Sequence, residues 1–136
     1  MRIVKTKFLN VMANLNFEIK SKANGVIILE LQNKGVSPVS LSRDSILLDG
    51  FTSNKFQITD LADQSKLEYQ GRSVKYKPEK FWLEAGSKVS SELDLLEVYF
   101  LESCHTYDVN FRNSIIADNE IVKISGSVNL TTMCDN

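Results

Sequence analysis

The chain has 136 residues, enough to bury one hydrophobic core and within the usual size of a single domain. Sixteen Lys and Arg against seventeen Asp and Glu give a net charge of −1, and neither sign is concentrated in a block. This balance argues against nucleic acid and acidic membrane surfaces as partners, and no apolar run approaches the roughly 20 residues that span a bilayer.

The N-terminal segment Met1–Leu9 carries basic residues. It lacks the uninterrupted apolar run of roughly 7–15 residues that a secretory signal needs. Taken literally, this start predicts a cytosolic protein, unless a signal segment has been removed.

Strand patterns dominate the chain from end to end. Asn14–Lys20 alternates polar and apolar residues, which places its apolar side chains on one face. Ala23-Asn24-Gly25 then predicts a hairpin turn, because Asn-Gly readily adopts positive φ. The almost continuously apolar Val26–Leu31 predicts a central strand that is covered on both faces and pairs with the first strand.

Further strand candidates follow at intervals of about 8–12 residues, with turn signals between them. They are Val39–Ser42, Asn54–Thr59, Leu67–Tyr69, Val74–Lys77, Lys88–Leu93, Tyr107–Ile115 and Val122–Leu130. Helical signals are thin, and Leu95–Leu101 predicts at most one helical turn.

The pattern as a whole predicts a single all-β domain over residues 1–136. We expect an antiparallel, immunoglobulin-like Greek-key β-sandwich of about seven to nine strands. Its predicted core contains Phe17, Ile19, Ile28, Leu31, Leu41, Phe56, Ile58, Val89, Leu93, Val109, Phe111 and Ile124.

Cys104 and Cys134 are the only cysteines, too few for a structural zinc site of four ligands. If Thr106–Ile115 and Ile121–Thr132 pair as an antiparallel hairpin, the numbers of any two residues that lie opposite each other add up to about 236. Cys104 would then lie near Thr132 and within about two residues of Cys134. Two alternatives stay open: a disulfide, or two free thiols as the cytosol favours.

The chain is short of catalytic residues. His105 is the only histidine, which excludes the HExxH helix of a zinc protease. Cys104 and His105 are adjacent, and neighbouring strand residues point to opposite faces, so they make a poor nucleophile and base. The glycines form no phosphate loop, and Asp60–Asp63 lacks the ligand alternation of a calcium loop. We predict no catalytic residue, no metal site and no cofactor.

Four aromatic residues lie close together in sequence: Tyr69, Tyr76, Phe81 and Trp82. Core packing is the commoner role for such residues, and exposed aromatic rings bind sugars or peptides. In Phe81-Trp82 the strand period sends one ring inward and the other outward, so at least one aromatic is expected at the surface.

Several segments occur in an order typical of one family. They are Leu67–Arg72, Val74–Pro78, Phe81–Ser87, Glu92–Leu95 with Val98-Tyr99, and Thr106–Val109, preceded by Leu29–Gly35 and Val39–Leu41. The series covers roughly residues 26–112 and resembles the N-terminal β-sandwich domain of deuterolysin-like zinc endopeptidases, the aspzincins, including the peptidyl-Lys type. The catalytic domain of that family, with its HExxH helix and Asp ligand, is not in this sequence.

The resemblance implies a non-catalytic, propeptide-like domain that binds a zinc metalloendopeptidase as an inhibitor or folding partner, in a secreted or periplasmic setting. The candidate partner-binding residues are Lys75, Tyr76, Lys77, Pro78 and Trp82. Lys77 would occupy the specificity pocket of a lysine-preferring enzyme, while Pro78 would hinder cleavage of the following bond.

Two alternatives from other classes remain. One is a carbohydrate-binding or adhesive module with Trp82, Tyr76 and Tyr69 as a stacking platform. The other is a structural assembly subunit in which sandwiches pair edge to edge. The sequence does not determine the oligomeric state or name the partner.

Overall fold

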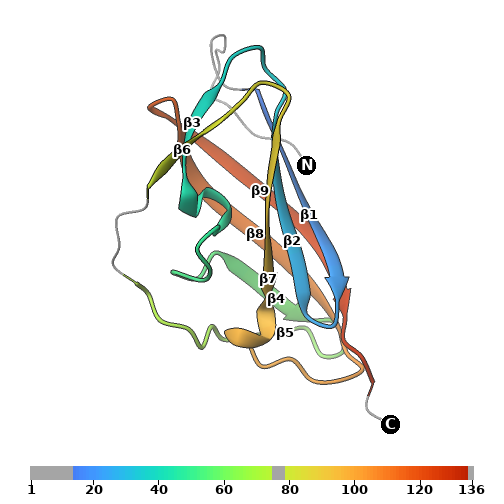
Figure 1. Cartoon of the computed structure of the whole chain (residues 1–136). Coiled ribbons are helices and arrows are strands. Elements are labelled where there is room, and N and C mark those ends of the chain that lie inside the picture. Colours follow the sequence, from blue (N-terminus) through green and yellow to red (C-terminus); the bar gives the residue numbers. More distant parts are fainter. Residues whose placement is uncertain (1–13, 75–78, 135–136) are drawn as a thin grey trace.

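The computed structural model describes residues 14–74 and 79–134 (Figure 1). Within these ranges the chain forms nine β-strands and two short 3₁₀ helices. The helices are η1 (Arg43–Ile46) and η2 (Leu95–Glu97). The strands are β1 (Leu15–Ala23), β2 (Val26–Asn33), β3 (Val39–Ser42), β4 (Phe56–Asp60), β5 (Ser65–Lys66), β6 (Lys80–Leu83), β7 (Lys88–Asp94), β8 (Thr106–Ala117) and β9 (Glu120–Thr131).

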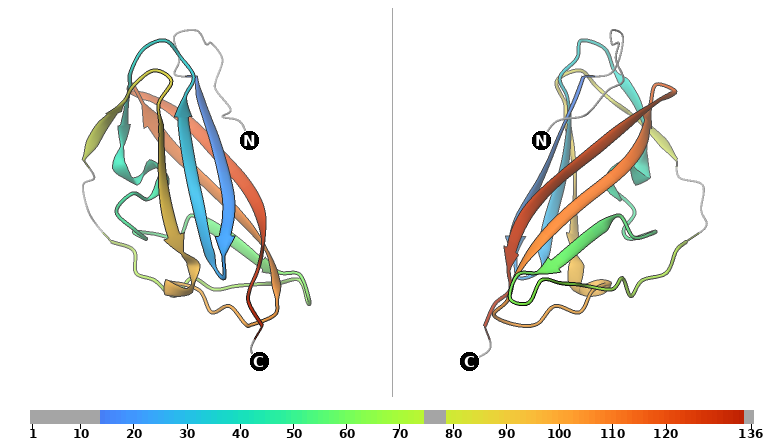
Figure 2. Two further views of the ribbon diagram at one scale, coloured as in Figure 1. Left: turned by 45° about the vertical axis from the view of Figure 1, so that its right-hand side comes forward. Right: turned by 180° about the vertical axis from the view of Figure 1, so that it is seen from behind.

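The strands form two antiparallel sheets that pack face to face (Figure 2). The smaller sheet has the order β1-β2-β7. The larger has the order β5-β4-β8-β3-β6, and β9 pairs with β8 along its whole length. The chain crosses between the sheets from β2 to β3, from β6 to β7 and from β7 to β8. The two antiparallel sheets confirm the predicted all-β sandwich.

Both predicted hairpins form through loops of two residues. Asn24 and Gly25 join β1 to β2 with φ of 34° and 95°, and Asp118 and Asn119 join β8 to β9 with φ of 50° and 67°. Positive φ at both central residues gives the turn a twist that matches the flanking strands. The β8–β9 ladder pairs Thr106 with Thr131, one residue further along than predicted.

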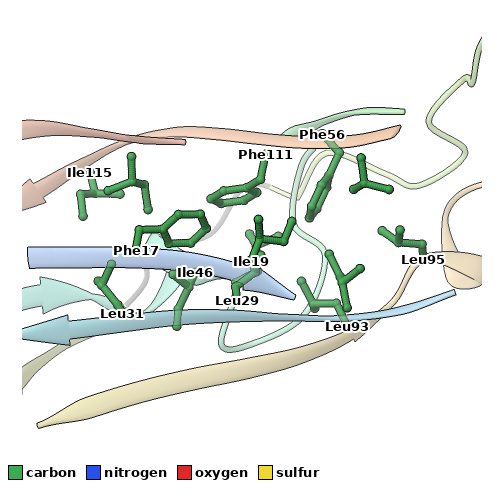
Figure 3. Close-up of a cluster of buried hydrophobic side chains, with 14 of the residues drawn as sticks. Phe17, Ile19, Leu29, Leu31, Ile46, Phe56, Leu93, Leu95, Phe111 and Ile115 are labelled. Atoms are coloured by element: carbon green, nitrogen blue, oxygen red, sulfur yellow. The ribbon is translucent and has the colours of Figure 1, made fainter. Parts of the chain in front are cut away.

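The core lies between the two sheets (Figure 3). Phe111 of β8 stacks on Phe17 of β1 with ring centroids 5.3 Å apart, and its centroid lies 5.1 Å from that of Phe56 on β4. All predicted core residues are buried except Ile28 and Val89. Val89 is partly buried against the core near the start of β7.

The prediction that β2 is covered on both faces is wrong. Its burial alternates, with Ile27, Leu29 and Leu31 buried and Ile28 only half-buried on the other face. The physical reason is that β2 belongs to a sandwich of two layers, in which each sheet has one face against the core and one toward solvent.

The predicted strand at Leu67–Tyr69 is also wrong, because the short β5 precedes it and this segment has no ladder. Leu67 and Tyr69 instead pack against the core from a loop. Val74 lies outside the strands, and the remainder of the predicted strand Val74–Lys77 lies outside the described residues. The expected helical turn is η2, whereas η1 was not predicted. The strand period assumed for Phe81-Trp82 is confirmed by β6, whose bounds were not predicted from the sequence.

Cys104 and Cys134 form a disulfide with a Cα–Cα separation of 4.4 Å. The bond resolves the alternatives that the sequence left open. Cys104 precedes β8 and Cys134 follows β9, so the disulfide closes the open end of the β8–β9 hairpin. The backbone N–H of Cys104 also donates to the carbonyl of Met133 at 3.2 Å.

Replacing both cysteines, Cys104→Ser with Cys134→Ser, is expected to lower the free energy of unfolding by roughly 2–4 kcal/mol. The reason is that the cross-link restricts the unfolded chain across a sequence separation of 30 residues. Urea denaturation of the variant measures the loss, and wild type in reductant should show a matching loss. An unchanged midpoint in both samples would contradict the proposed contribution.

Phe111→Ala is expected to destabilise the domain by about 3–5 kcal/mol, since it removes a fully buried ring that contacts both sheets. Ile121→Ala is the matched control, because Ile121 is 65% exposed and its truncation should change stability by less than about 0.5 kcal/mol. Similar urea midpoints for the two variants would show that the core is not centred on Phe111.

Candidate functional site

β6 forms an edge of the larger sheet. Among the described residues its hydrogen-bonded neighbour is β3 alone. The N–H of Arg43 donates to the carbonyl of Glu79 at 2.8 Å, in register with the β3–β6 ladder. Because antiparallel strands alternate bonded and non-bonded pairs, the N–H and C=O groups of Lys80 and Trp82 point away from β3. The outer side of β6 therefore presents a short row of backbone donors and acceptors.

A buried asparagine holds β6 in place. The Asn33 side chain is fully buried, and its Nδ2 donates to the carbonyls of Ser37 and Leu83 at 2.8 and 2.9 Å. Its Oδ1 accepts from the N–H of Gly35 at 2.9 Å. The backbone of Asn33 bonds to Gly86 and Ser87 in the turn between β6 and β7. Asn33 alone thus satisfies backbone polar groups in the β2–β3 loop, at the end of β6 and in the β6–β7 turn.

An apolar patch covers the outer face of the larger sheet beside this edge. It consists of Trp82, Ile116 and Ile121, which are 64%, 51% and 65% exposed. We call these residues the Trp82 patch. Leu41 pairs with Phe81 of β6 on one side and with Ala117 of β8 on the other, and these three side chains face inward. Because side chains alternate along a strand, the adjacent residues Trp82 and Ile116 face outward. Ile121 then joins the patch because it pairs with Ile116 across the β8–β9 ladder.

Polar groups lie around the patch. A depression beside the indole ring is lined by Ser40, Lys80, Trp82, Ile116, Asp118 and Asn119. The Asp118 carboxylate accepts from the N–H of Ser40 at 3.0 Å, which fixes its orientation at this rim. An apolar centre with a polar rim is the usual composition of a protein-binding surface.

The structure places the predicted site residues unequally. Trp82 is exposed while Phe81 is partly buried against the core, which confirms that one ring of this pair reaches the surface. Tyr69 packs edge-on against the buried Tyr99, with ring centroids 5.7 Å apart, so it fills the core periphery. Lys75, Tyr76, Lys77 and Pro78 lie outside the described residues.

Sequence reasoning missed Ile116 and Ile121 as surface residues. A signal for Ile116 was present, because it directly follows the predicted strand Tyr107–Ile115, and two successive residues of a strand cannot both face the core. Ile121 gave the same kind of signal, because it is adjacent to Val122 in the predicted hairpin strand Ile121–Thr132, and the predicted core residue Ile124 places Val122 on the inner face.

The sole histidine lies at the other end of β8. The Nδ1 atom of His105 is 2.7 Å from an oxygen of the Asp60 carboxylate and 3.8 Å from an oxygen of Glu102. The hydrogen bond with Asp60 raises the pKa of His105 above its ordinary value. Since Cys104 is held in the disulfide, it offers no thiol for a nucleophile and base pair with His105.

A comparison with protein-family models and with curated proteins found no match for this chain. The likeness to the N-terminal domain of deuterolysin-like endopeptidases stays a prediction from the ordered motifs. Within the described ranges no helix is both long enough and apolar enough to cross a membrane.

Trp82 is the only tryptophan, so its fluorescence reports on this surface alone. We expect the emission of the folded protein to be red-shifted, and its quenching by acrylamide to be efficient, because the side chain is largely exposed. Unfolding in urea should change both quantities little. A blue-shifted emission that moves to the red on unfolding would show that Trp82 is buried.

Proposed function

We propose that this chain is a non-catalytic protein-binding domain that engages its partner through the outer edge of β6 and the Trp82 patch. One observation carries the proposal. The largely exposed Trp82 lies on the edge strand β6, where the backbone N–H and C=O groups of Lys80 and Trp82 point away from β3. Monomeric domains normally protect such an edge or use it for association.

The edge and the patch complement each other as parts of one interface. A partner strand that pairs with Lys80 and Trp82 gains main-chain hydrogen bonds, which give affinity with little dependence on sequence. The side chains of the Trp82 patch supply apolar area beside those bonds. Tryptophan is among the residues that most often dominate binding energy when they become desolvated at the centre of an interface.

A zinc metalloendopeptidase is the partner class that we propose, with the domain acting as an inhibitor or folding partner. Two features support this choice. The ordered motifs resemble the domain that precedes such proteases, and Lys75–Pro78 is separated from β6 by Glu79 alone in the sequence. A strand added to β6 would therefore be continuous with a contact through Lys77.

A carbohydrate-binding role is the second candidate. It is supported by the position of the Trp82 indole beside the polar side chains of Ser40, Asp118 and Asn119. An exposed aromatic face with neighbouring hydrogen-bonding groups suits a sugar ring. Tyr69 does not extend this platform, since it packs against Tyr99. Binding of a glycan array by wild type and loss of that binding in Trp82→Ala would favour this role.

Strand addition at β6 is tested by Lys80→Pro. Proline removes the outward N–H of residue 80, whereas the hydrogen bonds between β3 and β6 come from Glu79, Phe81 and Leu83. We expect binding to a lysine-specific, deuterolysin-like endopeptidase to weaken while the thermal midpoint changes little. The control Lys80→Ala removes the side chain and keeps the N–H, so it should bind nearly as wild type. Equal binding by both variants would exclude pairing at this position.

The contribution of the Trp82 patch is tested by Trp82→Ala. We expect the inhibition constant against the same enzyme to rise by roughly 30-fold, the equivalent of about 2 kcal/mol for a central tryptophan. Lys77→Glu tests the pocket contact separately and should also weaken inhibition. If wild type neither binds nor inhibits the enzyme, the partner class is wrong. Light scattering then examines edge-to-edge assembly, which would appear as a concentration-dependent oligomer.

A further inference from the structure

Three donor atoms converge at the end of the molecule opposite the Trp82 patch. Asp60 is the last residue of β4, Glu102 lies in the loop after η2, and His105 directly precedes β8. The His105 Nδ1 atom and one oxygen of each carboxylate all lie within 4.8 Å of one another. Residues from separate segments of the chain therefore point at a common position.

The charges of these groups do not balance among themselves. Two carboxylates face the same imidazole nitrogen, at 2.7 Å from Asp60 and 3.8 Å from Glu102. A single proton on Nδ1 can make a short hydrogen bond to one of them and leaves the second carboxylate without a matching charge. A divalent cation at the position of that proton would be attracted to both carboxylates and to the nitrogen lone pair.

The distances fit a small divalent cation after modest adjustment. Zinc binds histidine nitrogen and carboxylate oxygen at about 2.0–2.2 Å, which separates neighbouring ligand atoms in a tetrahedral site by about 3.4 Å. The Asp60–His105 contact is shorter than this value and the Glu102–His105 contact is longer. Glu102 can close its gap because its side chain is 57% exposed and rotates about several bonds.

Hydrogen bonds and the disulfide hold the three candidate ligand residues in position. Asp60 is 4% exposed, and its second carboxylate oxygen accepts from the N–H of Ala62 at 3.0 Å. The hydroxyl of Thr132 accepts from the N–H of His105 at 3.1 Å and donates to the carbonyl of Glu102 at 2.6 Å. The disulfide holds Cys104, the neighbour of His105. Such contacts limit the reorganisation that ligand binding would require.

We propose that Asp60, Glu102 and His105 form a binding site for a divalent transition-metal ion of the zinc class. One imidazole nitrogen with two carboxylate oxygens suits zinc, and the set lacks the thiolates that would favour softer ions. The His105 ring would bind through Nδ1 and keep its proton on Nε2. The metal would join the end of β4 to the loop that enters β8. This site is separate from the proposed protein-binding surface, and it departs from the sequence-based expectation of no metal site.

The test uses the oxidised full chain without an affinity tag, titrated with ZnCl₂. Because His105 is the only histidine, its ring nitrogen signals in a ¹⁵N spectrum report on this site without overlap. We expect saturable binding of one zinc per chain, with the larger shift at Nδ1. Calorimetry should show affinity reduced by about tenfold or more in Glu102→Gln. The control Glu120→Gln removes an exposed carboxylate at the opposite end of β8 and should bind zinc as wild type.

Two outcomes would overturn the proposal. One is the absence of any His105 ring shift at saturating zinc. The other is zinc binding that is equally strong in wild type, Glu102→Gln and Asp60→Asn, which would indicate an adventitious ion only. Glu102→Gln keeps the test interpretable if the buried Asp60→Asn variant fails to fold, since Glu102 is exposed. Neither outcome bears on binding through β6.

Discussion

The burial of Phe111 between the two sheets is the interaction on which the rest of the structure depends. Its ring contacts Phe17 of the smaller sheet and Phe56 of its own sheet, and it is fully buried. The strand that carries it, β8, pairs with β3, β4 and β9. One central strand therefore links the apolar contact across the layers to the hydrogen-bond ladders along the larger sheet.

The same constraint places both surfaces of interest. Burying Phe111, Ile115 and Ala117 on the inner face of β8 forces Ile116 to face outward, because side chains alternate along a strand. Ile116 then lies in the Trp82 patch at one end of β8. At the other end, the strand begins directly after His105, and the disulfide ties this entrance to the end of β9. The proposed protein-binding surface and the proposed metal site therefore lie at opposite ends of the β8–β9 hairpin.

Different interactions stabilise the protein near the Trp82 patch and near His105. At the end of β6, the buried amide of Asn33 satisfies three backbone groups, two in the β2–β3 loop and one at Leu83, and no apolar residue of that size could replace its donors and acceptor. At the His105 end, a covalent bond and the hydroxyl of Thr132 perform the equivalent role. The edge of β6 presents main-chain groups that point outward beside an apolar patch, and this combination supports its proposed use in binding.

Local patterns in the sequence determined much of this protein. Alternation predicted the fold class, and all but two of the predicted core residues are buried; Asn24-Gly25 predicted its hairpin, because these features depend on neighbours within a few residues. The β8–β9 register even brought Cys104 close to Cys134. Only the tertiary structure decided which face of β2 is buried, that β6 pairs with β3, and that Trp82 lies beside Ile116. It also decided that Asp60 meets His105, 45 residues away in sequence. Contacts of this kind arise from how sheets pack and which strands become neighbours, and no local pattern of residues encodes that choice.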